Sequence, residues 1–241
     1  MSPSESAGST FRRLKRRLEP LLGEATTPET LVAAVLELPL RRVANPLISF
    51  FYHPEPLLRW RAISVFGVAA AALAETEPES ARVMMRRLMW QLNDESGGIG
   101  WGAPEAMGES MARSPRLAGE YHRILVSYVR LDGNYLEHSI LQRGSLWAVG
   151  RLAEVRPDLV RPAGPALNPF LCSPDAHHRG LAARAAGLIG IRSLAPRLEA
   201  LRHDPEEITL YHDWRLEAVG VGILAAEALA RLGGRARRGD S

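Results

Sequence analysis

The residues best suited to binding chemistry lie in one glycine-rich stretch, LNDESGGIGW at 92–101. It offers two carboxylates, a hydroxyl and three glycines, and it leads into a predicted helix. Glycines let backbone N–H groups approach a ligand, and a helix N-terminus adds further donors. We expect either a ligand or partner loop, or an extended turn whose acids cap the next helix and pair with neighbouring arginines. The candidate binding residues here are Asp94, Glu95, Gly97, Gly98, Gly100 and Trp101.

Two further acids follow in the predicted helix, Glu105 and Glu109. Because they are four residues apart, they share one helix face, and Glu105 joins the candidate binding residues. No GK[ST] follows the glycines, so the stretch is not a phosphate-binding P-loop.

Tryptophan and arginine recur near the start of five similar segments. The segments are WRAISVFG (60–67), WGAPEAMG (101–108), RGSLWAVG (143–150), RGLAARAAG (179–187) and DWRLEAVG (213–220). Equivalent positions in stacked repeats form a ridge, and Trp and Arg are preferred anchors of binding surfaces. The ridge residues are Trp60, Trp101, Arg143, Arg179 and Trp214. They are candidate binding residues; alternatively, the tryptophans cover the repeat core at its edge.

The segments are predicted to be helices with small residues on one face. A glycine ends each of the first four, at positions 67, 108, 150 and 187, and Gly222 continues the register. Glycine inside a helix costs about 1 kcal/mol relative to Ala, so a recurrent glycine indicates close helix packing. Prolines at 78, 115, 157 and 196 start the intervening helices. Each period of about 35 to 42 residues is therefore a helix pair.

These paired helices resemble HEAT repeats, specifically the short HEAT-like repeats of the phycobilisome-lyase type. The resemblance is carried best by SPDAHHRGLAARAAGLIG (173–190) and YHDWRLEAVGVGILAAEAL (211–229). It implies an all-α, armadillo-type fold, a right-handed α-solenoid of about five helix pairs over 43–232. Residues 10–42, with helices at 11–22 and 28–38, form an N-terminal cap, so 10–232 are one domain. We expect 1–9 to be disordered and 233–241 to be a flexible tail.

Several function classes are disfavoured by composition. The single cysteine, Cys172, excludes an intrachain disulfide and a Cys-based zinc cluster, and its setting in NPFLC predicts a packed thiol. The apolar run at 62–74 is too short to span a bilayer and predicts a buried helix. The polar N-terminus lacks a secretory h-region. We therefore expect a cytoplasmic protein without a membrane partner.

Histidines recur in the predicted turns, at 53, 138, 177, 178 and 212. The di-iron HEAT protein deoxyhypusine hydroxylase uses repeated His-Glu pairs, and this sequence has none. The expectation is therefore no metal and no cofactor, with the histidines as solvated turn residues.

The resemblance implies a non-enzymatic protein-interaction or scaffold module that binds a protein partner through its concave face or turn ridge. One alternative is a DNA-binding or alkylbase-glycosylase-like solenoid. HEAT-like glycosylases use an aromatic cleft with an Asp and an Arg, for which Trp90, Asp94, Arg123 and Arg130 are candidates. The basic residues of helix 11–22 would suit a DNA backbone; they are Arg12, Arg13, Lys15, Arg16 and Arg17. A second alternative is an accessory or lyase-like factor for a cofactor-bearing protein.

Overall fold

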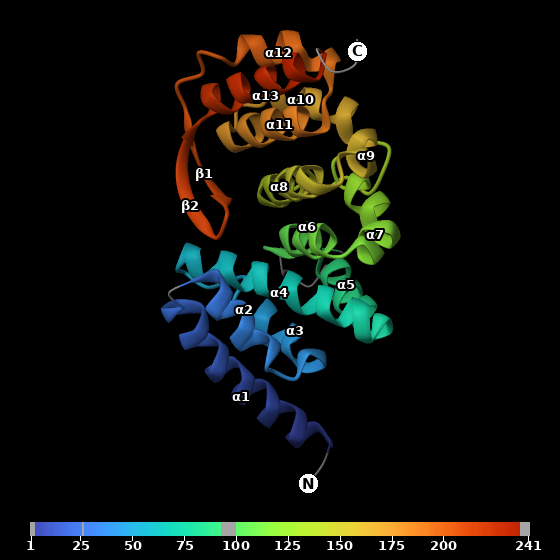
Figure 1. Cartoon of the computed structure of the whole chain (residues 1–241), viewed down its shortest axis with the longest axis vertical. Helices are drawn as coiled ribbons and strands as arrows, with labels where there is room; N and C mark the ends of the chain where they lie inside the picture. Colours follow the sequence, from blue (N-terminus) through green and yellow to red (C-terminus); the bar gives the residue numbers. More distant parts are fainter. Residues whose placement is uncertain (1–2, 26, 93–99, 237–241) are drawn as a thin grey trace. The chain divides into compact units, whose positions relative to one another are not determined.

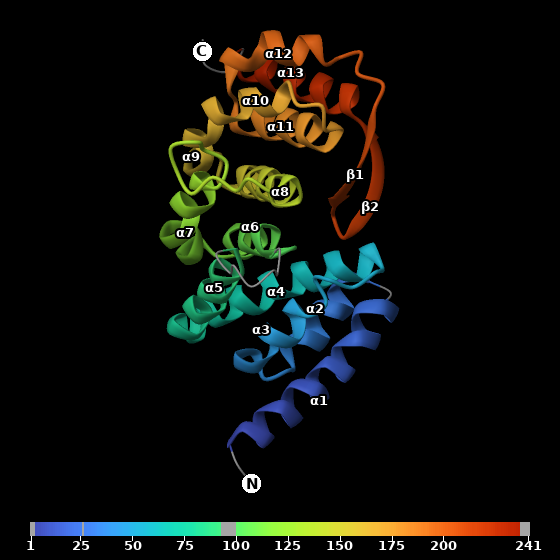
Figure 2. The same ribbon diagram turned by 180° about the vertical axis from the view of Figure 1, so that it is seen from behind.

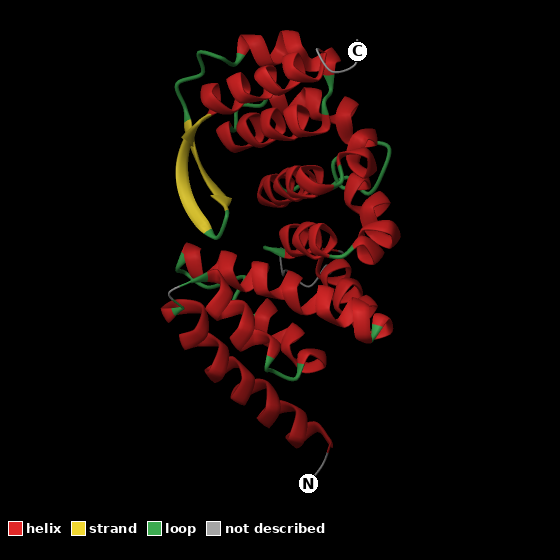
Figure 3. Ribbon diagram, viewed as in Figure 1, coloured by secondary structure: helices red, strands yellow, loops and turns green. Residues whose placement is uncertain are grey.

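The computed structural model describes residues 3–25, 27–92 and 100–236. Apart from one β-hairpin, the regular elements of these residues are helices (Figures 1 and 3). The chain divides into two compact units, Met1–Leu117 and Ala118–Ser241. The predicted all-α class is confirmed.

Unit 1 is built around helix α4. Its helices are α1 (Pro3–Glu24), α2 (Pro28–Leu36), α3 (Leu40–Ile48), α4 (Pro56–Thr76), α5 (Pro78–Leu92) and α6 (Ala103–Arg113). α4 packs against α2, α3, α5 and α6. The two predicted N-terminal helices are present, but α1 begins at Pro3, so residues that we expected to be disordered continue the helix. Pro3 occupies the first helical position, where the missing proline N–H costs no hydrogen bond.

α4 is longer than the apolar run predicted. Its 21 residues have the length and composition of a membrane-crossing helix, yet 67% of its most apolar window is buried within the protein. Its side chains are the centre of a core: Ala62, Val65 and Phe66 have no exposed surface. α4 therefore occupies the position of a core helix.

Recurrent glycines lie where helices approach closely, as the sequence predicted. A Cβ on Gly67 of α4 would lie 2.6 Å from Glu109 Cγ on α6. In unit 2, a Cβ on Gly187 would lie 2.5 Å from the Cα of Ala228. Real Cβ atoms do not tolerate such distances, so these glycines set the helix spacing.

Unit 2 combines helices with the hairpin. Helix α7 (Pro115–Ser127) begins at the end of unit 1 and continues here. The others are α8 (Ser139–Val155), α9 (Pro157–Val160), the 3₁₀ helix η1 (Arg161–Ala166), α10 (Leu167–Leu171), α11 (Ala176–Ile189), η2 (Arg192–Leu194), α12 (Ala195–Ala200) and α13 (Val221–Ala236). α11 packs between α8 and α13.

The fifth segment, predicted to be a helix, is instead part of a β-hairpin. Strands β1 (Glu207–His212) and β2 (Arg215–Gly220) pair antiparallel, with His212 opposite Arg215. Asp213 and Trp214 form the two-residue turn, both at positive φ. The run from 207 to 210 alternates in burial, the strand periodicity. This alternation, together with Asp213 at the turn, favours a hairpin. The small residues that this segment shares with the other four segments favoured a helix instead.

The hairpin runs beside α8 and α11 in both views (Figures 1 and 2). Trp147 Nε1 of α8 donates to the carbonyl oxygen of Tyr211 at 2.9 Å. A Cβ on Gly180 of α11 would lie 2.9 Å from Ile208 Cδ1, so this glycine makes room for the strand. Unit 2 thus covers part of its own helical surface with β1.

Candidate functional site

Trp101 lies at the entry to α6 within an aromatic cluster of unit 1. Its ring stacks on that of Tyr52, with centroids 6.1 Å apart and planes inclined by 26°. Tyr52 follows α3 and is 43% exposed. Burial raises the pKa of Tyr52, and a hydrogen bond with the backbone of Gly100 partly opposes this. The aromatic pair therefore joins the turn after α3 to the residues before α6.

Gly100 and Gly102 have a conformational role beside this pair. Both adopt positive φ, 65° and 78°, where side chains other than glycine are strained. A Cβ on Gly100 would lie 2.8 Å from the carbonyl oxygen of Gln91, and one on Gly102 would lie 2.9 Å from the Phe51 ring. The close approach of Gly100 brings the end of α5 next to Trp101.

Glu105 lies in the first turn of α6, four residues after Trp101. Burial raises the pKa of its carboxyl to about 7, and the charge of Arg59 only partly opposes this. Its neighbour Glu109 is different, since its Oε1 accepts a 2.6 Å hydrogen bond from Arg113 within α6. The acid pair predicted from sequence therefore splits into one ion-paired residue and one unpaired residue.

Three buried polar atoms of this region have no hydrogen-bond partner among the residues that the structure describes. They are Gln91 Oε1, Trp101 Nε1 and Glu105 Oε2. An unpaired buried polar group costs about 1–3 kcal/mol, so such atoms need an explanation. Beside Gln91 in α5, Trp90 is 72% exposed. We call Tyr52, Trp90, Gln91, Trp101 and Glu105 the Trp101 site.

Part of the predicted site lies outside the described residues. These positions are Asp94, Glu95, Gly97 and Gly98. Of the predicted loop, the structure therefore brings together Gly100, Trp101 and the adjoining Glu105. Sequence reasoning did not include Tyr52 and Gln91, because their contacts with Gly100 and Trp101 depend on tertiary packing.

The ridge arginines form ion pairs between successive helical segments of unit 2. Arg143 of α8 pairs at 2.7 Å with Asp175, the N-cap of α11. Burial raises the pKa of Asp175, but Arg143 and nearby positive charge outweigh this, so the pKa lies below its ordinary value. Arg179 of α11 pairs at 2.6 Å with Asp204, whose pKa it lowers. These side chains link one segment to the next.

The ridge tryptophans do not occupy equivalent positions. Trp60 is half-buried on α4, and Trp101 precedes α6. Trp214 lies in the hairpin turn at φ 64°, so its alignment with the other four was wrong. The shared letters of the fifth segment belong to a strand, where successive side chains point to opposite faces.

Among the turn histidines, His178 differs from expectation, as does the cysteine. His138 caps α8 by accepting a hydrogen bond from the N–H of Ile140 at 3.3 Å. His178 is 5% exposed, and its ring nitrogens contact Ser173 Oγ and the carbonyl of Ser139, so it is not a solvated turn residue. Cys172 is exposed rather than packed, because α10 ends at Leu171 and the chain turns there.

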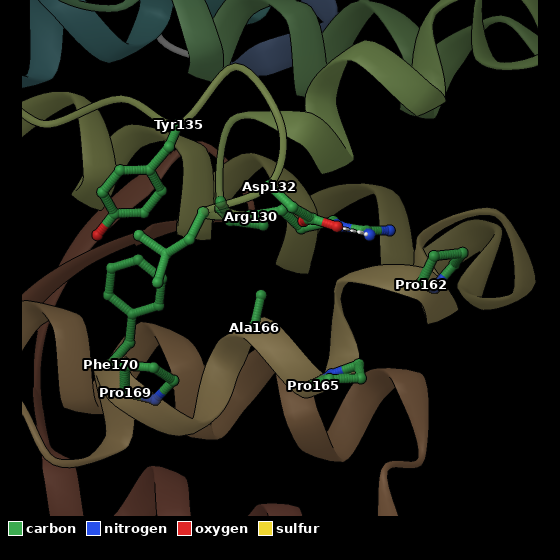
Figure 4. Close-up of a pocket in the computed structure, with 10 residues that line it drawn as sticks. Arg130, Asp132, Tyr135, Pro162, Pro165, Ala166, Pro169 and Phe170 are labelled. Atoms are coloured by element: carbon green, nitrogen blue, oxygen red, sulfur yellow. Dashed lines mark hydrogen bonds and ion pairs between the residues drawn. The ribbon is translucent and has the colours of Figure 1, made fainter.

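Unit 2 contains a cavity of about 400 Å³ that sequence reasoning missed (Figure 4). Tyr135 and Phe170 stack on one side of it, 6.5 Å apart, and the ion pair of Arg130 with Asp132 lies on another. Three prolines also line it: Pro162, Pro165 and Pro169. Their spacing was the available signal, since positions three and four apart share a helix face.

Comparisons with known proteins place the chain by fold. No family model matches it. An uncharacterized protein of Archaeoglobus fulgidus is 35% identical over 111 residues, 46% of this chain and 54% of that protein, so the chain spans about half of the relative's length. An engineered protein matches with a TM-score of 0.52 and 15% identity, over 90% of this chain and 97% of its own. A designed armadillo repeat protein matches with a TM-score of 0.49 and 17% identity, over 91% and 99%.

Likeness at such identities concerns the fold alone. Together with the helix arrangement, it shows an all-α solenoid fold. The finer HEAT-type assignment stays a prediction from sequence.

Proposed function

We propose that this protein is a non-enzymatic protein-interaction module that contacts a protein partner through the Trp101 site of unit 1. A repeat solenoid offers extended surfaces for partners, which supports an interaction role. The site combines one strongly exposed tryptophan, an aromatic stack and three unpaired polar atoms. Exposed tryptophan and tyrosine are preferred anchors of protein interfaces.

The unpaired atoms carry the proposal and indicate the chemistry of the partner. Gln91 Oε1 and Glu105 Oε2 are acceptors, and Trp101 Nε1 is a donor. Lysine and arginine side chains are donors without acceptors, so a basic partner matches the chemistry of these two acceptors. Its positive charge would also favour the ionised form of Glu105, whose pKa of about 7 leaves it partly protonated near neutral pH. The exposed aromatic ring of Trp90 in α5 also attracts cations.

The arginines of the predicted ridge contribute less to this surface. Arg179 is engaged by Asp204, Ser173 and Pro174, and its side chain is 14% exposed. Removing it from these partners would take away the ion pair of Asp204. The proposed contact surface is therefore the Trp101 site, and it does not include Arg143 and Arg179.

A photo-crosslinking amino acid at position 90 tests the proposal. In a lysate of the source organism, we expect a discrete crosslinked protein from position 90. The matched control carries the crosslinker in place of Ile223, a 57% exposed residue of unit 2, and should not yield that product. The product should contain a basic segment at the crosslink.

Direct binding of the identified partner is then measured for Glu105→Gln and Tyr52→Ala. We expect each to weaken binding about tenfold or more, as for an interface anchor. Glu75→Gln, at an exposed position of α4, is the charge control. Equal capture from positions 90 and 223, or full affinity of Glu105→Gln, would exclude the Trp101 site.

A further inference from the structure

Helix α1 presents a dense cluster of positive charge on its outer face. Arg12, Arg13, Arg16 and Arg17 are exposed. Phe11–Leu18 contains no carboxylate, and Glu19 is the first acid to follow. Like charges four residues apart repel, which destabilises a helix slightly. The residues within this segment of α1 therefore do not neutralise the positive charge of the cluster.

Most other arginines of the described chain have a counter-ion or a carbonyl partner. Arg86 pairs with Glu79, Arg113 with Glu109 and Arg184 with Glu154. For the four α1 arginines, no described carboxylate lies within ion-pair distance, and Arg12 contacts only the carbonyl of Gly8 in its own helix. Their charge is therefore available to an external anion.

The apolar face of α1 is already used by unit 1. Leu14, Leu18 and Leu22 are at most 2% exposed, and α1 packs against α2, α3 and α4. A helix that binds a membrane surface inserts its apolar face between the acyl chains. α1 has no such face free, so its exposed arginines bind through charge and hydrogen bonds alone.

We propose that the α1 arginine cluster binds the phosphate backbone of duplex nucleic acid without sequence selectivity. Residues 12 to 17 extend over about 7.5 Å of helix, at 1.5 Å per residue. Duplex DNA carries one charge per roughly 1.7 Å of axis, so about four phosphates lie alongside four arginines. The guanidinium fork matches phosphate oxygens, and no aromatic reader of bases belongs to this cluster.

Salt-dependent binding of a fluorescent 20-base-pair duplex to the full chain tests this proposal. With three to four phosphates neutralised, affinity should fall about 40- to 150-fold between 50 and 200 mM salt. Replacing Arg12, Arg13, Arg16 and Arg17 with Gln should weaken binding at 50 mM at least tenfold and flatten the salt dependence. Gln keeps helix propensity, and an unchanged melting temperature will show that unit 1 remains folded.

The matched control removes the same charge from unit 2. Its substitutions to Gln are at the exposed residues Arg161, Arg192, Arg197 and Arg202. This variant should bind the duplex within about twofold of the parent chain. Equal loss in both variants, or no binding at 50 mM salt, would overturn the proposal. The proposal would also be overturned if polyglutamate, compared at equal charge, displaced the labelled duplex as well as unlabelled duplex does. Tighter binding to phosphatidylserine vesicles than to the duplex would overturn it too.

Discussion

At Glu105, burial disfavours the ionised carboxylate, whereas the proposed binding of a basic partner favours it. Its folded-state pKa of about 7 lies above the ordinary value of 4.5 because burial penalises the charged form. The folded state therefore holds a proton that the unfolded state releases, so stability falls as pH rises from about 4.5 to 7. Glu105→Gln removes this cost. We expect the variant to be more stable above pH 7 by up to about 3 kcal/mol.

Thermal unfolding of both proteins at pH 4 and pH 8 measures this effect. The difference should vanish at pH 4, where the carboxyl is neutral in both states. Glu75→Gln, at an exposed position of α4, is the matched substitution control. If Glu105→Gln is more stable but binds the partner less well, Glu105 contributes to binding and not to folding. Equal stability at pH 8 would contradict the raised pKa.

Arg179 stabilises unit 2 through a nearly buried ion pair. Its side chain is 14% exposed and that of Asp204 is 9% exposed, and it also donates to two carbonyl oxygens. Arg179→Met leaves these acceptors unpaired, so we expect a loss of about 2–3 kcal/mol in urea unfolding. Arg202→Met removes a pair with 49% and 58% exposed side chains and should cost less than about 0.5 kcal/mol. Similar losses of stability in Arg179→Met and Arg202→Met would show that burial of the ion pair makes no difference.

At the scale of elements, the spacing between α11 and α13 depends on Gly187. Gly187→Ala places a Cβ against the backbone of α13 and should destabilise the protein by about 1–3 kcal/mol. Gly119→Ala is the control, because Gly119 has open space around it. That change should stabilise α7 by about 0.5–1 kcal/mol. Denaturant midpoints measure both, and stabilisation by Gly187→Ala would contradict the packing role.

The repeated helices could be read from sequence, but the hairpin could not be read from the repeat. Glycines at fixed spacing indicated close packing because few other roles keep glycine inside a helix. At 213–220, Trp, Ala and Gly matched the pattern while the residues before them alternated like a strand. The pairing of Tyr52 with Trp101, and the cavity beside Phe170, depend on contacts between separate segments. No local pattern encodes such contacts.

Docking of the hairpin on α8 depends on Trp147. Trp147→Phe removes the donor to the Tyr211 carbonyl and should cost about 1–2 kcal/mol. We expect faster amide hydrogen exchange over Glu207–Gly220, with little change in α12. Trp90→Phe, at a 72% exposed position, should leave exchange in the hairpin unchanged. Unaltered hairpin protection in Trp147→Phe would show that other contacts hold β1.

At the scale of the whole molecule, arginine serves two purposes. The basic residues number 30, against 27 acidic ones, so the net charge is only +3. Many of the arginines in the described chain are consumed by ion pairs such as Arg143 with Asp175, which link successive segments. In α1, by contrast, four exposed arginines that form no ion pair with a described residue lie within six consecutive residues, so positive charge is concentrated there. Charge placement distinguishes a candidate binding surface here better than total charge does.

The two units should respond to acid in opposite directions. Between pH 7 and pH 5, unit 1 gains stability as Glu105 is protonated in the folded state. In unit 2, burial lowers the pKa of His177, so the unfolded state takes up the proton first and stability falls below pH 6.5. Asp175 and Asp204 have lowered pKa values, so their contribution is lost only below about pH 3.8. Hydrogen exchange at pH 7 and pH 5, corrected for intrinsic rates, should show slower exchange in α4 and α6 and faster exchange in α8 and α11. Glu105→Gln should abolish the first change and His177→Asn the second, whereas a common shift of both units would refute this assignment.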